Sequence, residues 1–146
     1  MGSITEGKSV GQLAALAIGV AYSAGAVAGF CVTGFSDVTA SHDKTMLGLT
    51  LNPFQDFFHL FVGGLLLIAA LKWTTVTCEG LLLGVGAIYI IAAITGFTYA
   101  HIPVITIVTA GNLDNYLHLV TGLTAIAGSL LSTSITNSKG RATATS

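Results

Sequence analysis

Four apolar stretches, each about as long as a lipid bilayer is thick, occupy most of this 146-residue sequence. Crossing the hydrocarbon core as a helix takes roughly 20 mostly apolar residues. Four segments meet this requirement: about 10–30, 53–71, 76–97 and 117–135. The last third of the second segment, Leu65 to Leu71, shows no alternation of polar and apolar residues, which excludes membrane β-strands. The sequence therefore predicts an all-α integral membrane four-helix bundle.

Composition limits the remaining possibilities. Hydrophobic residues make up 53% of the chain and charged residues 8%, whereas a soluble domain carries about 25% charged residues. The connections between the apolar segments are short and rich in Thr, Ser and Gly, so we expect one transmembrane domain over residues 1–146, with a flexible polar tail from Ser132 onward. The sequence contains no nucleophile motif, phosphate-binding loop, cysteine metal cluster or nucleic-acid patch. It predicts a non-enzymatic protein whose first partner is the lipid bilayer.

The distribution of basic residues predicts the orientation. Lys8, Lys72, Lys139 and Arg141 fall at the N-terminus, the middle loop and the C-terminus, while Lys44 stands alone in the other loops. Cytoplasmic loops of membrane proteins carry an excess of Lys and Arg. We therefore expect both termini in the cytoplasm, in a bacterial inner membrane or a thylakoid-type membrane.

The histidines recur at a fixed spacing, which indicates an internal repeat. His59 and His118 are 59 positions apart. Two further pairs share this spacing: His42 with His101, and Gly63 with Gly122. The pattern predicts two duplicated helical hairpins in parallel repeat, related by a pseudo-twofold axis along the membrane normal. Such an axis places His59 and His118 at equal depth.

An acidic residue precedes each histidine of the second pair. Asp56 lies three residues before His59, and Asp114 lies four residues before His118. Residues at these spacings share a helix face. Because an imidazole inside a membrane helix has lost its water partners, we expect each histidine to find a protein partner, and its own aspartate is the nearest one.

Three interpretations of the histidines stay open. In the first, His59 and His118 bond to the aspartates, or to hydroxyls such as those of Tyr22 and Tyr89, and simply lock the outer end of the bundle. In the second, the two histidines ligate a haem or a pigment, with the aspartates as acceptors behind them. In the third, they carry protons or ions. A metal site is less favoured because no compact two-ligand spacing is present, and the metal, if any, is unknown.

Small residues predict where helices approach one another. Gly63 and Gly122 each follow a histidine by four residues and remove bulk from its face. Further small residues at spacings of four lie on the first and third segments: Ala21, Gly25, Gly29, Gly80 and Gly84. We expect these residues to bring the helices of the bundle together. The alternative is a docking face for a homo-oligomer or a larger membrane complex.

The two histidine blocks also carry a resemblance to a known family. The segments Asn52 to Gly63 and Asn112 to Gly122 resemble an uncharacterised family of bacterial four-span membrane proteins, domain of unknown function forty-three eighty-three, over about Leu13 to Leu131. The resemblance implies four transmembrane helices and the duplicated histidine motif, without a defined activity. Asp56 stands where members similar to this chain often carry an amide.

Together these patterns favour a non-enzymatic accessory or scaffolding subunit of a membrane complex. The first alternative is a membrane carrier of a histidine-ligated haem or pigment. The second is proton or ion conduction, which ranks last because the second and fourth segments have few polar residues beyond the histidines, mainly Thr121, Thr124 and Ser129.

Overall fold

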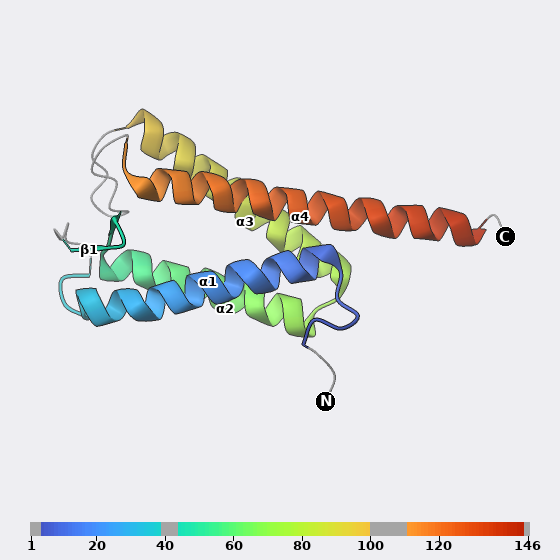
Figure 1. The fold of residues 1–146 in the computed structure, drawn as a ribbon, viewed down its shortest axis with the longest axis horizontal. Coiled ribbons are helices and arrows are strands. Elements are labelled where there is room, and N and C mark those ends of the chain that lie inside the picture. The colour runs from blue at the N-terminus through green and yellow to red at the C-terminus, as the bar shows by residue number, and fades with distance from the viewer. Residues whose placement is uncertain (1–3, 39–43, 100–110, 145–146) are drawn as a thin grey trace.

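The computed structural model describes residues 4–38, 44–99 and 111–144. His42, His101 and Asp43 lie outside these ranges. Four helices follow one another in chain order (Figure 1): α1 (Val10–Thr33), α2 (Pro53–Lys72), α3 (Thr75–Thr98) and α4 (Leu113–Ala144). Each is long and apolar enough to cross a membrane. The predicted all-α four-helix membrane fold is therefore confirmed.

Side-chain caps start the first three helices. The Ser9 hydroxyl accepts from the Gln12 N–H and the Gln12 side chain accepts from the Ser9 N–H, which forms a capping box at α1. The Asn52 side chain accepts from the Gln55 N–H at the start of α2, with Pro53 at the first helical position. Thr74 caps α3 in the same way. Each cap satisfies a backbone N–H that lipid would leave without a partner.

The fourth helix is longer at both ends than the sequence predicted. It begins at Leu113, where the Asn112 side chain accepts from the Asp114 N–H. It runs to Ala144, so the prediction that the polar tail from Ser132 is flexible is wrong. Its Ser and Thr side chains are compatible with a helix because a hydroxyl can bond the carbonyl one turn back, as Thr133 does to Ser129.

A small β-hairpin, which was not predicted from the sequence, lies between α1 and α2. Its strands are β1 (Thr45–Met46) and β2 (Leu49–Thr50), paired antiparallel. The two turn residues, Leu47 and Gly48, have φ values of 55° and 83°, the twist that two-residue hairpin loops require. The hairpin lies at the end of the bundle where α2 and α4 begin, opposite the start of α1 (Figure 1). We call these the hairpin end and the terminal end.

The helices pack as two antiparallel pairs. α1 contacts mainly α2, α3 contacts mainly α4, and the pairs meet chiefly through α1 and α4. The centre is a core of small and aliphatic side chains that includes the fully buried Ala15, Leu66, Leu82 and Ala125. The outward faces expose Leu, Ile, Val and Phe side chains, as expected for helices in contact with lipid.

Glycine pairs mark the closest approach within each helical pair. A methyl added to Gly19 would lie 2.9 Å from the Gly63 carbonyl oxygen, and one on Gly63 would lie 3.0 Å from that of Gly19. Gly86 and Gly122 are equivalent, at 3.0 Å in each direction. Helices this close leave no room for a side chain at the crossing. Gly63 and Gly122 therefore occupy the packing positions that the sequence predicted.

The predicted packing ridges on α1 and α3 need correction. Gly25, Gly80 and Gly84 have open space where a methyl would be, and they are exposed, as is Ala21. Gly29, in contrast, is buried against the Asp56 side chain of α2. A spacing of four places small residues on one face, but it does not say whether that face points to another helix of the bundle.

The buried positions of the two helical pairs match along the chain. Buried residues of α1 have buried counterparts on α3 that lie 67 positions later in the sequence: Ala15 with Leu82, Ile18 with Val85, Gly19 with Gly86, Tyr22 with Tyr89 and Ala26 with Ala93. Buried residues of α2 have buried counterparts on α4 at a spacing of 59: Val62 with Thr121, Gly63 with Gly122, Leu66 with Ala125 and Ala70 with Ser129.

Candidate functional site

Four rings, one from each helix, meet in the half of the bundle nearer the hairpin end. The four-ring cluster consists of Tyr22, His59, Tyr89 and His118. The Tyr22 ring lies 4.7 Å from the His59 ring and 5.1 Å from the Tyr89 ring, centroid to centroid. Tyr89 lies 5.4 Å from His118, and the two imidazoles are 6.2 Å apart. The structure thus brings together the two histidines that the sequence singled out.

Hydrogen bonding within the four-ring cluster is incomplete. The Tyr22 hydroxyl donates to Thr121 Oγ1 on α4 at 2.9 Å. Tyr89, 2% exposed, and His118, 5% exposed, each bury a polar atom. In the described structure His118 Nδ1 has no hydrogen-bond partner, and the Tyr89 hydroxyl makes no hydrogen bond of good geometry, with only a weaker polar contact with the Tyr22 side chain. Buried polar groups without partners are uncommon in proteins, and a polar ligand or water is one way to satisfy them.

The first predicted acid, Asp56, is directed at α1. Its Oδ2 accepts from the Thr33 hydroxyl at 2.9 Å, and its Oδ1 lies where a methyl on Gly29 would be. Asp56 is 1% exposed, and within the described parts of the chain its Oδ1 has no hydrogen-bond partner. Through its bond to Thr33, the carboxylate joins α1 to α2.

The second predicted acid, Asp114, is directed at the β-hairpin. Its Oδ2 accepts from the Thr50 N–H at 3.1 Å, and the Gln55 side chain also hydrogen-bonds it. Neither carboxylate hydrogen-bonds a histidine within the described residues, which corrects the expected pairing of each acid with its own histidine. A shared helix face brings two side chains near each other, but the nearest partner on a neighbouring element decides the bond.

Two clefts open beside the four-ring cluster. The larger cleft, about 230 Å³, lies between α1, α2, α4 and the β-hairpin, and its lining includes Tyr22, Asp56, His59 and Asp114. The smaller cleft, about 70 Å³, lies between α2 and α3. Its lining includes His59, Tyr89 and His118. His59 borders both clefts, so it is the member of the cluster best placed to meet a ligand from either side.

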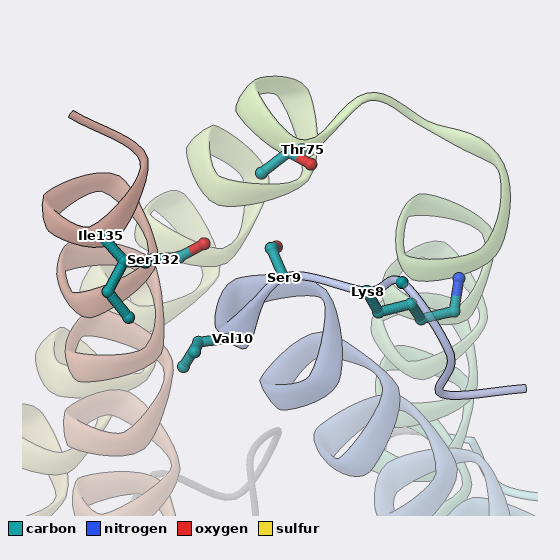
Figure 2. A pocket seen from close by; sticks show the side chains of 7 residues that line it. Lys8, Ser9, Val10, Thr75, Ser132 and Ile135 are labelled. Carbon is teal, nitrogen blue, oxygen red and sulfur yellow. The ribbon is translucent and has the colours of Figure 1, made fainter. Parts of the chain in front are cut away.

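A third cavity, of about 350 Å³, lies at the terminal end. Figure 2 shows Ser9, Thr75 and Ser132 around it, while the Lys8 side chain turns away toward α2. There the Lys8 ammonium donates to the Ala70 carbonyl oxygen at 2.8 Å. The residues at this end thus act mainly in ending and starting helices.

One more buried acid, Glu79, lies toward the terminal end. Its Oε2 accepts from the Thr133 hydroxyl at 3.0 Å, and its backbone carbonyl accepts from the Ser129 hydroxyl at 2.9 Å. Between these groups and the four-ring cluster, the core is apolar, and Leu66, Leu82 and Ala125 are fully buried there. The polar groups of the described structure therefore form two separate zones.

These features define the class of protein to which the chain belongs. Four apolar helices with lipid-facing outer surfaces make this a small integral membrane protein, and no group of three His, Cys, Asp or Glu side chains that could hold a metal ion is found among its described residues.

The family is equally clear. The protein-family model described as "Domain of unknown function (DUF4383)" matches residues 12–131, so the chain belongs to this family. No curated protein and no solved structure matches the chain.

Sequence reasoning missed several residues of the site. Thr33 and Thr121 contact the predicted groups across helices, and nothing in their local sequence distinguishes them from other membrane threonines. The pairing of Tyr22 with Tyr89 had a signal, because both lie three residues after a buried glycine, Gly19 or Gly86.

Proposed function

We propose that this protein is a non-enzymatic scaffolding subunit that assembles in the membrane through the outer face of α3. This α3 face consists of Gly80 and Gly84 with the exposed apolar side chains beside them. Val76, Leu83, Ile88 and Ile91 are all more than one-third exposed. The pattern of small residues in a groove with larger aliphatic residues on its rim is typical of helix–helix contacts in lipid.

The observation that carries this proposal is that the α3 face has no function inside the bundle. Gly80 and Gly84 have open space beside them, while the contact between α3 and α4 uses Gly86 and Gly122 instead. A glycine in the interior of a helix costs up to about 1 kcal/mol relative to alanine. Two such residues one turn apart on the lipid side are better explained by an external helix than by internal packing.

The simplest external helix is α3 of a second copy of the chain. Two identical faces related by a twofold axis are self-complementary, and a Gly-x-x-x-Gly pair lets their backbones approach closely. A homodimer of this kind has a four-helix bundle on each side of its interface.

Energy transfer between labelled copies tests this proposal. Cys31 is exposed and Cys78 is buried, so a maleimide dye attaches preferentially at Cys31. Donor- and acceptor-labelled protein is reconstituted together in liposomes at decreasing protein-to-lipid ratios. We expect transfer to persist on dilution for the unmodified protein and to fall in Gly84→Leu.

The matched control is Gly64→Leu. Gly64 lies on α2, also has open space beside it, and has no small residue four positions away. Gly64→Leu should therefore leave the transfer unchanged. Equal transfer in Gly84→Leu and the unmodified protein, or transfer that disappears on dilution in both, contradicts the proposal.

The haem or pigment alternative has weaker support. A porphyrin would have to lie between His59 and His118, yet these imidazoles pack against Tyr22 and Tyr89 at 4.7 and 5.4 Å. The larger cleft, at about 230 Å³, is also smaller than the roughly 300 Å³ at which pockets for drug-sized ligands begin. The residues present do not fit a macrocycle.

The conduction alternative also has weaker support. Along α4, Thr121 and Ser129 are eight positions apart, which is roughly 12 Å of helix at 1.5 Å per residue. The fully buried Leu66, Leu82 and Ala125 lie in the core of this part of the bundle. An ion or proton would have to cross this layer without polar groups.

We further propose that the chain arose by duplication of one helical hairpin and that both termini are cytoplasmic. The match of buried positions between α1 and α3, and between α2 and α4, supports the duplication, and a parallel repeat follows from it. The bias of Lys and Arg supports the orientation. A protease-protection assay on inside-out and right-side-out vesicles, with a tag after Ser146, tests it.

A further inference from the structure

Matched positions line the two clefts beside the four-ring cluster. On α1, Ala21, Tyr22 and Gly25 line the larger cleft. On α3, their counterparts 67 positions later, Ile88, Tyr89 and Ala92, line the smaller one. In the same way, Asp114 and Leu117 of α4 stand in the larger cleft where Gln55 and Phe58 of α2 stand in the smaller. The clefts can therefore be compared residue by residue.

The larger cleft has the smaller side chain at four of the five matched positions. It has Ala21 where the smaller cleft has Ile88, and Gly25 where the smaller has Ala92. It also has Leu117 in place of Phe58 and Asp114 in place of Gln55. The resulting volumes are about 230 Å³ and 70 Å³. The larger cleft is open at the exposed Ala21 and Gly25, so a ligand can enter it from the surface of α1.

The two clefts also differ in charge. Gln55 lines both clefts, but only the larger one is also lined by aspartates, Asp114 and Asp56. Among the described residues, Asp56 Oδ1 has no hydrogen-bond partner. The described residues that line the larger cleft include no Lys or Arg. Lys44, which lies near this end, donates instead to the Thr33 carbonyl oxygen at 3.0 Å.

We propose that the larger cleft binds a small, lipid-soluble organic amine. Its ammonium group lies at the Asp114 carboxylate, since buried charges in proteins are paired. The ring of Tyr22 lines the same space, and the face of a tyrosine ring attracts a cation. The apolar part of the ligand lies along Ala21, Gly25 and the β-hairpin, whose Met46, Leu47 and Leu49 form the roof.

This inference rests on the comparison of the two clefts and is independent of the docking proposal for α3. It predicts a ligand with a positive charge at one end and an apolar body at the other. A molecule of the same shape without the charge has the apolar contacts alone.

Calorimetric titration of the full-length protein in detergent tests the inference. The probes are 2-phenylethylamine, which is cationic at pH 7, and 2-phenylethanol, which has the same shape and no charge. We expect saturable binding of the amine and at least about tenfold weaker binding of the alcohol, because a charge-assisted hydrogen bond is roughly twice as strong as a neutral one. Absence of saturable heat with the amine, or equal affinity for both probes, overturns the proposal.

The chain supplies its own variants for this test. The double variant Ala21→Ile with Gly25→Ala gives the larger cleft the residues that stand at the matched positions of the smaller one. Both positions are exposed, and Gly25 has open space for a methyl group. We expect it to abolish amine binding. Gly64→Ala, also at an open position, should bind the amine as the unmodified protein does. Amine binding that survives in the filled variant places the probe elsewhere and overturns the proposal.

A second variant separates loss of binding from loss of folding. Asp114→Asn keeps an oxygen to accept from the Thr50 N–H, so the β-hairpin contact can remain. We expect the amine to bind at least about tenfold more weakly and the alcohol to bind unchanged, with helical circular dichroism preserved. Unchanged amine affinity in Asp114→Asn contradicts the assignment of the ammonium to this carboxylate.

Discussion

The hydroxyl of Tyr22 donates to Thr121 Oγ1 across the contact between α1 and α4, at 2.9 Å. Its counterpart on α3, Tyr89, buries a hydroxyl that makes no hydrogen bond of good geometry in the described structure and has only a weaker polar contact with the Tyr22 side chain. The two tyrosines occupy matched positions and both belong to the four-ring cluster, yet one joins the two helical pairs and the other does not. The difference arises because Val62 of α2 stands at the position that matches Thr121.

Removing each of these hydroxyls should have different effects. Tyr22→Phe should lower the free energy of unfolding by roughly 0.5–1.5 kcal/mol, the range for interhelical hydrogen bonds in membranes. Tyr89→Phe should leave stability unchanged or raise it, since it removes a buried polar atom without breaking a bond. Unfolding by SDS in mixed micelles, followed by circular dichroism, measures both. A larger loss for Tyr89→Phe than for Tyr22→Phe would contradict the hydrogen-bond assignment.

Gly29 should be the glycine of α1 least tolerant of a methyl group. In Gly29→Ala the new methyl overlaps the Asp56 carboxylate, and overpacking of a buried site costs typically 1–3 kcal/mol. Gly25→Ala, one turn earlier with open space beside it, should be neutral or slightly stabilising because alanine favours the helix. The same SDS titration compares the two. Equal stability of both variants would show that the Asp56 side chain moves away without cost.

The crossing of α3 and α4 should depend on Gly86 in the same way. A methyl there would lie 2.7 Å from the Ile126 side chain and 3.0 Å from the Gly122 carbonyl oxygen. We expect Gly86→Ala to lower the thermal unfolding midpoint in detergent, with a cost of about 1–3 kcal/mol. Gly64→Ala, at a glycine of α2 that meets no neighbour, is the control and should keep the midpoint or raise it. A loss in the control as large as in Gly86→Ala would contradict the assignment of Gly86 to the crossing.

Lys8 should stabilise the end of α2. Its ammonium donates to the Ala70 carbonyl oxygen, one of the last carbonyls of the helix, which have no partner within the helix itself. Lys8→Met should lower the free energy of unfolding by about 1 kcal/mol, and hydrogen exchange should rise in the last turn of α2. Lys72→Met, at an exposed lysine in that same turn, should have a smaller effect. An equal effect of both variants would point to general electrostatics instead.

The sequence predicted the fold well because lipid imposes a simple rule on the backbone. Segments of sufficient length and hydropathy must be helical, and all four predicted segments coincide with helices. The sequence also predicted that His59 and His118 lie at the same depth, because other residue pairs share the spacing of 59 positions that separates them. The same reasoning failed at α4, where polarity was taken as a sign of flexibility although Ser and Thr side chains can remain within a helix.

By itself, the sequence determined that the protein lies in lipid, how many helices it has and which two histidines meet toward one end of the bundle, because each of these depends on composition and spacing along one chain. The tertiary structure decided which partners the buried groups take. Asp56 bonds Thr33 and Asp114 bonds the Thr50 N–H, since a side chain bonds whatever a neighbouring element places within about 3 Å. The unequal size of the two clefts is likewise a property of packing, because it appears only when matched residues face each other across the bundle.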